Sequence, residues 1–199
     1  MAVKALTPLY FYTAVVLCLF GLTREPLSLS ASVLLLTSGL LSWGLLEYVL
    51  HRFVFHYDAQ SVSGKKLVYA AHLSHHEDPR ATDRIFSSLM ISAPVATAYL
   101  LVARIATGSW RAASLLFTGL VLGYFYYEWL HFRAHHRRSR LRLFRYLRKY
   151  HLLHHYQTPE LRFGVSSPLF DIIFGTFRPV GRRVYATKKH KSSNRFGDF

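Results

Sequence analysis

Four apolar stretches divide the first two thirds of the chain. They run over residues 8–22, 31–50, 86–106 and 112–130. A helix needs about 20 apolar residues to cross the hydrocarbon core of a bilayer, so three stretches are close to the length of a membrane span and the first is short. The pattern therefore predicts an all-α integral membrane protein with four transmembrane helices. For the first stretch the alternative is a signal-peptide core, with cleavage near residues 28–31.

The distribution of charge orients these predicted spans. The chain has 199 residues, of which 51% are hydrophobic, and a formal net charge of +15. A basic nucleic-acid-binding protein is usually polar, so we expect a membrane setting and no nucleic-acid partner. Arg and Lys gather in residues 51–85 and again after residue 130. The positive-inside rule therefore places both segments in the cytoplasm, for a multi-pass protein of a bacterial inner membrane or of the endoplasmic reticulum.

Histidine is the unusual residue of this chain, with twelve copies, eleven of them between His51 and His155. Ten form four groups that follow the second and fourth apolar stretches: His51 and His56; His72, His75 and His76; His131 and His135; His151, His154 and His155. Residues three and four apart share a face of a helix, so each of the last three groups should present its imidazoles along one edge. The spacing of five in the first group requires the helix to end or loosen there.

These histidines predict a pair of metal ions. Imidazole binds zinc, copper, iron and nickel, and the only thiol is that of Cys18. Ten ligands exceed the four of a structural zinc site, and they suit two ions that keep positions open for dioxygen. His136 points about 100° away from His135 on a helix, and His190 lies in a polar tail, so both fall outside the set. Carboxylates are expected behind the neutral rings, and the candidates are Glu47, Asp78, Glu128 and Asp171.

The same residues resemble the fatty acid hydroxylase and sterol desaturase superfamily. Residues 47–56, EYVLHRFVFH, are similar to the first histidine box of the fatty acid 2-hydroxylases, and residues 148–155, RKYHLLHH, resemble the last box. Residues 163–176 resemble the segment that follows that box. The resemblance implies a four-span protein whose cytosolic helical cap carries a dimetal site, with the ten histidines named above as its ligands.

The resemblance also implies an enzyme, an oxidoreductase that uses O2 and electrons to oxidise a lipid. We expect a fatty acid or fatty acyl substrate, two iron ions (or zinc in purified protein), and an electron donor in trans that is cytochrome b5-like or ferredoxin-like. The catalytic domain would cover residues 31–180. It would follow an N-terminal span and loop at residues 1–30 and precede a basic disordered tail at residues 181–199.

Other interpretations stay open. Desaturation is an alternative to hydroxylation, a sterol or carotenoid is an alternative substrate, and a non-catalytic metal-binding membrane protein is an alternative class. A metal transporter would place ligands in the middle of its spans, whereas these histidines follow the span ends. No residue is assigned to the substrate. Arg133 and Arg137 are candidates for contact with a lipid head group, or else anchors at an anionic membrane surface.

Overall fold

The structure is a computed structural model that describes residues 2–181, with side chains from residue 7 onward. All regular structure in this part of the chain is helical, which confirms the predicted all-α class. The predicted tail at residues 181–199, with His190, lies outside the described residues except for Gly181. The helical elements are α1 (Ala2–Leu22), α2 (Leu29–Val49), η1 (Leu50–Phe55), α3 (Val62–Val68), η2 (Tyr69–Leu73), α4 (Ser74–Glu77), α5 (Leu89–Thr107), α6 (Trp110–His136), α7 (Arg142–Tyr156) and α8 (Leu169–Ile173).

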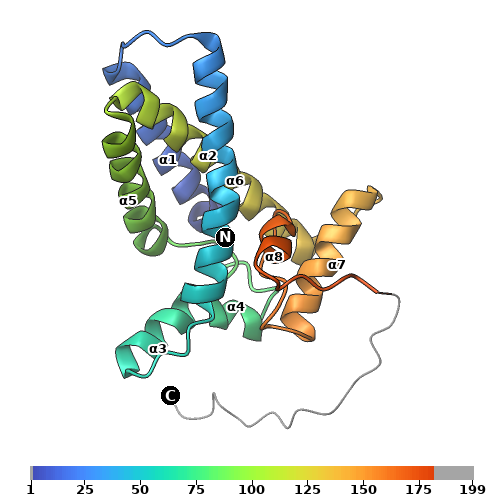
Figure 1. Ribbon diagram of the computed structural model, residues 1–199. Helices are drawn as coiled ribbons and strands as arrows, with labels where there is room; N and C mark the ends of the chain where they lie inside the picture. Colours follow the sequence, from blue (N-terminus) through green and yellow to red (C-terminus); the bar gives the residue numbers. More distant parts are fainter. Residues whose placement is uncertain (1, 182–199) are drawn as a thin grey trace.

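Four long helices, α1, α2, α5 and α6, form an upright bundle, and the short elements gather at its lower end (Figure 1). Side-chain caps set where two of these helices begin, because the Ser28 hydroxyl accepts from the Ala31 amide and the Ser109 hydroxyl accepts from the Ala112 amide. Gly108 adopts a left-handed conformation, with φ of 65°, and ends α5 just before α6 starts. The bundle therefore places the ends of α2 and α6 at the lower side, where both carry histidines.

Helices α2 and α6 touch through their backbones. A Cβ atom added at Gly39 would lie 2.1 Å from the Leu116 carbonyl oxygen, and one added at Gly119 would lie 2.2 Å from the Leu36 carbonyl oxygen. Glycine is required at both positions, since no side chain fits between the helices. This contact fixes the distance between the two helices that lead into the first and third histidine groups.

The core of the bundle is apolar and aromatic. Tyr12 from α1 is buried against Phe117, Leu120, Val121 and Tyr124 of α6. The Tyr12 ring meets the Tyr124 ring edge-to-face, with centroids 5.7 Å apart. The first apolar stretch therefore forms a helix that packs into the same core as α6.

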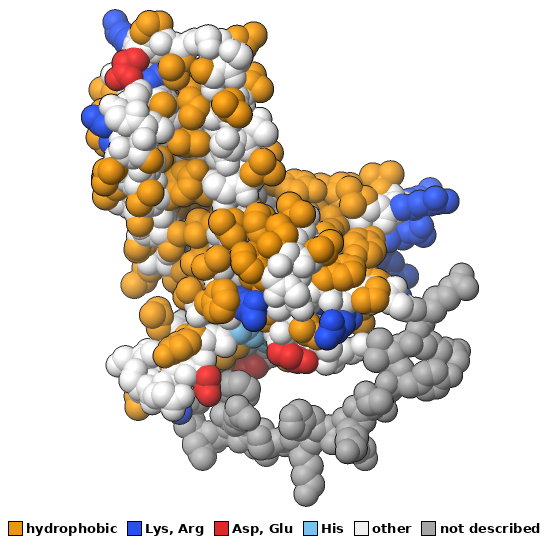
Figure 2. All heavy atoms as spheres, in the orientation of Figure 1, with side chains coloured by type: hydrophobic (Ala, Val, Ile, Leu, Met, Phe, Trp, Pro, Cys, Tyr) orange, Lys and Arg blue, Asp and Glu red, His pale blue; other side chains and the backbone are white. Residues whose placement is uncertain are grey.

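Two helical segments, Leu29–Phe55 and Leu89–Thr107, are long and apolar enough to cross a membrane, and Thr7–Leu22 is a shorter apolar helix. Only 11% and 6% of the two apolar windows are buried inside the protein, whereas a core helix of a soluble domain would be mostly buried. The apolar side chains instead cover the outside of the bundle (Figure 2). Helix α6, which contains the fourth predicted span, does not meet the same criterion of length and composition.

Gly119→Ala is expected to destabilise the protein by about 1–3 kcal/mol, because the added methyl group would push α2 and α6 apart. Thermal unfolding of the detergent-solubilised protein measures this as a lower Tm. Gly21→Ala in α1 is the matched control, since a Cβ there meets nothing within 4 Å. An equal Tm for the two variants would contradict the close contact.

Candidate metal centre

The first histidine pair lies where α2 changes into the π-helix η1. His51 belongs to η1, and His56 follows its last residue, Phe55. A π-helix pairs residue i with residue i+5, so residues five apart lie on one side of it. The predicted loosening of the helix is confirmed, and the His51 and His56 ring centroids lie 5.1 Å apart.

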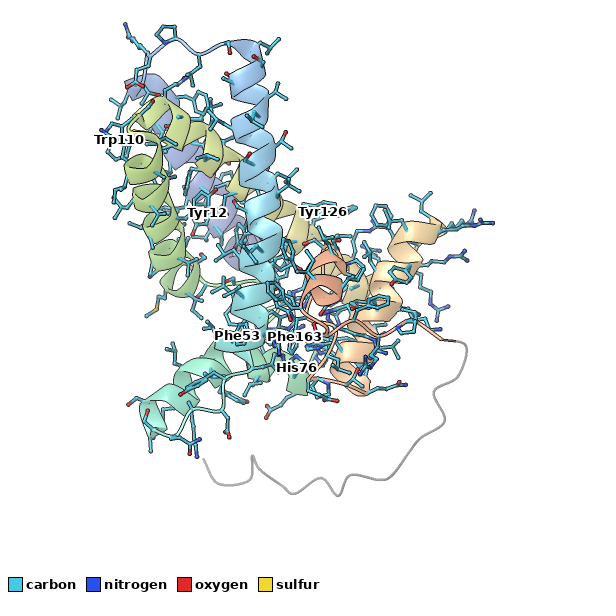
Figure 3. All side chains as sticks on the ribbon, in the orientation of Figure 1. Tyr12, Phe53, His76, Trp110, Tyr126 and Phe163 are labelled. Carbon is cyan, nitrogen blue, oxygen red and sulfur yellow. The ribbon has the colours of Figure 1, made fainter. Side chains whose placement is uncertain are left out.

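The structure brings all ten predicted histidines together at the lower end of the bundle, in two groups of five. Figure 3 labels His76 there, beside Phe163. In each group the ring nitrogens that face inward all lie within 4.8 Å of one another. The first cluster contains His51, His56, His72, His76 and His154. The second cluster contains His75, His131, His135, His151 and His155.

The expectation that each helical group presents all its rings along one edge is wrong in two cases. His72 and His76 face the first cluster, but His75 faces the second. In α7, His151 and His155 face the second cluster, but His154 faces the first. The residues four apart stay together, while the one between them turns toward the neighbouring cluster. Helix α7 thereby supplies both clusters, and so does the continuous segment formed by η2 and α4.

The inward nitrogens of the first cluster are spaced as ligands of one ion. His72 Nε2 lies 3.0 Å from His51 Nε2 and 3.0 Å from His76 Nε2. His154 Nε2 lies 3.2 Å from His56 Nε2. Two nitrogens bound at right angles to one ion, each at about 2.1 Å, are about 3.0 Å apart.

The second cluster has the same spacing. His151 Nε2 lies 2.8 Å from His135 Nε2 and 3.0 Å from His155 Nε2. His75 and His131 are 1% exposed, and neither nitrogen of either ring has a hydrogen-bond partner within the described residues. Leaving buried polar atoms unpaired is costly, so these rings fit metal binding better than a purely structural role.

The electrostatics of both clusters favour neutral imidazoles, the form that binds metal. Burial lowers the pKa of His56 and of His75 to about 4. Burial, with the neighbouring histidines, lowers the pKa of His76 to about 2. Ordinary imidazole has a pKa near 6.5, so these rings need not lose a proton before they bind an ion at neutral pH. The described residues therefore could hold metal ions in both clusters.

Backbone carbonyls hold two rings of the first cluster from behind. His51 Nδ1 lies 2.5 Å from the Phe163 carbonyl oxygen, and His154 Nδ1 lies 2.7 Å from the Leu161 carbonyl oxygen. Since a carbonyl only accepts, each Nδ1 carries the proton and each Nε2 is free to bind metal. Sequence reasoning missed both partners, because a backbone oxygen has no signature in the sequence.

The four candidate carboxylates lie elsewhere, and among the described residues none hydrogen-bonds to a histidine ring. Glu47 and Asp171 are buried and accept from backbone amides of residues 163–166. Glu128 accepts from the Ser87 amide at 3.0 Å. Asp78 accepts from the Arg80 amide at 3.3 Å. Glu47 and Asp171 thus bind the segment that also supplies the Phe163 carbonyl.

Two depressions reach the clusters. A largely apolar cleft between α1, α2, α5 and α6 has about 660 Å³ of empty space, part of it open to the outside, and His51 is among its lining residues. A second, larger depression is lined by His56, His76 and His155, and also by Arg52 and Glu160. Figure 2 shows histidine there, between basic and acidic side chains. The first cluster therefore borders the apolar cleft through His51, and both clusters border the second depression, whose lining includes charged side chains.

The remaining sequence candidates lie apart from both clusters. The His136 ring stacks on Phe132, with centroids 4.6 Å apart, and is in neither cluster. Arg133 and Arg137 line a small separate depression that contains no histidine of either cluster. The Arg133 guanidinium lies over the Trp129 ring, 4.9 Å from its centroid. A head-group contact by these arginines stays a prediction.

Comparisons with known proteins agree with this arrangement. The fatty acid hydroxylase family model matches residues 36–176. A dihydroceramide fatty acyl 2-hydroxylase of Arabidopsis thaliana is 35% identical over 175 residues, which are 85% of this chain and 71% of the relative. A ceramide very long chain fatty acid hydroxylase of Saccharomyces cerevisiae is 37% identical over 148 residues, which are 70% of this chain and 36% of the relative.

A solved structure is also similar. It is full-length scs7p, of which only the hydroxylase domain is visible, and it matches with a TM-score of 0.80 and 27% identity over 92% of this chain and 70% of that chain. The helical fold, two helices long enough to cross a membrane and two histidine clusters that could hold metal ions agree with a membrane-associated oxygenase, the class to which these relatives belong. The chain belongs to the fatty acid hydroxylase family.

If the second cluster holds one ion, His75→Ala is expected to lower the bound metal by about one ion per chain, because it removes a buried candidate ligand. Elemental analysis of the purified protein measures this ratio. His136→Ala is the matched control, since His136 lies next to a cluster residue but in neither cluster. Equal metal content in both variants would remove His75 from the ligand set.

Proposed function

We propose that this protein is a membrane-bound dimetal oxygenase that hydroxylates the acyl chain of a lipid. The observation that carries the proposal is the contact between an apolar cleft and one of two adjacent five-histidine clusters. The relatives named above are hydroxylases of fatty acyl groups and ceramides, so we propose carbon 2 of a fatty acyl chain as the position oxidised. The ten clustered histidines are the proposed ligands.

The overall reaction balances as a lipid C–H bond, O2, two electrons and two protons giving a lipid alcohol and water. When bound, a pair of iron ions supplies the redox chemistry that lets dioxygen react with a C–H bond. The histidines hold the pair in place, and the buried positions of His51, His75 and His154 keep water from that side of the site. Zinc is the alternative occupant in purified protein, since imidazole binds either metal.

The cleft supports the choice of an apolar substrate. Its walls include Leu50 and Phe55 beside His51, and Ile91 and Val95 on the facing helix α5. An acyl chain lying in the cleft would bury its methylene groups there, at about 0.8 kcal/mol for each one removed from water. The acyl chain would then enter the cleft from the bilayer side of the bundle, and a carbon near the lipid head group would face the histidine clusters.

The proposed topology has four spans formed by α1, α2 with η1, α5 and α6, and a cytosolic cap formed by the other helices. Its support is the placement of Arg and Lys after α2 and α6, on the side that carries the histidines. Residues 31–180 would then be the catalytic domain. The protein would be a multi-pass protein of the bacterial inner membrane or the endoplasmic reticulum, with a cytoplasmic active site.

The two electrons would come from a separate carrier, cytochrome b5-like or ferredoxin-like. Arg and Lys are abundant in the segments that follow α2 and α6, and Arg52 lines the second depression together with Glu77 and Glu160. A positive surface favours docking of an acidic partner and increases its rate of association at low salt. The second depression is the proposed path for electrons and protons, separate from the lipid cleft.

Expression in a host should add 2-hydroxylated acyl chains to its lipids, because the proposed position of oxidation is carbon 2 of the acyl chain. Mass spectrometry of lipids with and without the gene measures this. His154→Ala should abolish the product and leave membrane insertion intact, since it removes a ligand and no residue of the long helices. Unchanged product in the variant, or no new hydroxylated lipid in the host, would contradict the proposal.

Val95→Trp is expected to raise KM for an acyl substrate at least about tenfold, because a larger side chain would fill the cleft. The metal content should stay at the wild-type ratio. Val102→Trp is the matched control on the same helix, where the side chain is 64% exposed. Turnover assays of the two purified variants measure KM for each. Equal KM values would show that the acyl chain does not lie in this cleft.

A further inference from the structure

The two clusters differ in what lies behind their rings. In the first cluster, two of the five rings donate a hydrogen bond from Nδ1 to a backbone carbonyl. In the second cluster, the described residues offer no hydrogen-bond partner to the Nδ1 atoms of four of the five rings, which are His75, His131, His151 and His155. The rings of the first cluster are therefore better fixed in tautomer and direction before any ion binds.

Both carbonyls belong to one short segment, residues 161–166, which we call the carbonyl loop. Arg162 lies between the two carbonyl-bearing residues, is 3% exposed, and adopts the left-handed conformation with φ of 61°. A residue other than glycine is rarely found in this conformation, and it persists only where its surroundings enforce it. The Arg162 amide donates to the Thr176 carbonyl at 3.2 Å, and its guanidinium donates to the Thr158 hydroxyl and the Arg178 carbonyl.

Asp171 holds the first half of the carbonyl loop. Its two carboxylate oxygens accept from the amides of Phe163 and Gly164, each at 2.8 Å, and one of them also accepts from the Thr176 hydroxyl at 2.7 Å. The approach is close, because a Cβ atom at Gly164 would lie 3.0 Å from Asp171 Oδ2 and 2.1 Å from the Ser167 carbonyl oxygen. Asp171 is fully buried, so all its hydrogen-bonding capacity is spent inside the protein.

Glu47 holds the second half of the carbonyl loop. Its Oε1 accepts from the Val165 amide at 2.5 Å and from the Ser166 amide at 2.9 Å, and its Oε2 accepts from the Ser166 hydroxyl. Glu47 lies one helical turn before His51 on the same helix. The helix that carries a cluster histidine thus also anchors the loop that orients that histidine.

We propose that Glu47 and Asp171 are positioning residues for the metal centre, and that the carbonyl loop they hold makes the first cluster the tighter of the two metal sites. The proposal rests on the dimetal centre of the proposed function. Fixing His51 and His154 in advance lowers the cost of ordering them when an ion binds. Partners of this kind are worth about 10–100-fold in metal affinity. The ion in the second cluster should therefore leave first.

The test is the release of metal from the purified, iron- or zinc-loaded protein into excess chelator, followed by elemental analysis over time. Wild-type protein is expected to lose one ion per chain at least about tenfold faster than the other. His75→Ala should lack the fast phase, and His154→Ala should lack the slow phase. Release of both ions at one rate would overturn the inference, as would loss of the slow phase in His75→Ala. The release curve of the wild-type protein tests the inference by itself, even if a variant fails to fold.

Substitutions at the two carboxylates test the positioning role. Asp171→Asn keeps the volume but turns an amide donor toward either Gly164 or the pair of Phe163 and Thr176, so one loop group loses its acceptor. Its slow phase should accelerate about 10–100-fold, with the fast phase unchanged. Glu47→Ala should behave in the same way. An unchanged slow phase in both variants would remove these residues from the proposal.

Glu47→Gln tests rescue by a conservative variant. The glutamine oxygen can accept from the Val165 and Ser166 amides, and its NH2 group can donate to the Ser166 hydroxyl oxygen. The slow phase should therefore stay within about threefold of wild type. A slow phase as fast as that of Glu47→Ala would show that the carboxylate charge, and not the held loop, governs retention.

Glu128→Ala is the matched control for loss of a buried carboxylate, because Glu128 accepts from the Ser87 amide, outside the carbonyl loop. It should lower Tm without accelerating the slow phase. Acceleration of the slow phase in Glu128→Ala would indicate a general effect of destabilisation and overturn the assignment.

The dimetal function and the inequality of the two sites fail in different ways. Fewer than two ions in wild-type protein would refute the dimetal function, whereas two ions released together would refute only the inequality of the sites.

Discussion

Seven of the ten clustered imidazole rings are buried, and a buried ring nitrogen is costly unless it has a hydrogen-bond or metal partner. Within the described residues, the candidate carboxylates accept from other groups and none hydrogen-bonds to these rings. The inward nitrogens lie 3.0 Å apart in the pair His51 and His72 and 2.8 Å apart in the pair His135 and His151, which is also the spacing of nitrogens that bind one ion. The rest of the structure provides rigid supports that bring these rings to two points.

The supports work at different depths. At the middle of the bundle, Gly39 and Gly119 let α2 and α6 approach until their backbones touch. At the lower end, the π-helical turn of η1 changes the direction of successive side chains so that His51 and His56 can both point inward. A second π-helical segment, η2, precedes α4 and ends just after His72. Two π-helical segments therefore precede or contain histidines of the first two groups, whereas α6 and α7 supply theirs from regular α-helix.

Much of this arrangement could be predicted from the sequence, because apolar runs and histidine spacing are periodic signals. The ten clustered histidines, the helical class and the loosened turn at His51 all follow from such signals. The division of the ten rings between the two clusters does not follow from them. Whether His75 joins His72 or His131 depends on how α4 meets α6, which no local spacing encodes.

The oxygens behind His51 and His154 escaped prediction for a related reason. They belong to the backbone of residues 161–166, and backbone groups are the same in every sequence. Glu47 and Asp171 were expected near the rings as direct partners, and the structure gives them loop amides to bind. Because burying a carboxylate is costly without a partner, the sequence can indicate that such a residue is paired, but the fold determines which group is the partner.

The order of the ligands along the chain bears on how the centre is assembled during synthesis. Four of the five first-cluster histidines precede residue 77, whereas four of the five second-cluster histidines follow residue 130. A ribosome therefore completes α2 and α4, with most of one cluster, before α6 has been made. The missing histidine and the loop that orients its ring emerge together, near the end of the described chain. Closing the first cluster and building the second are thus late events that share α7, and a nascent chain that stops before α7 has neither.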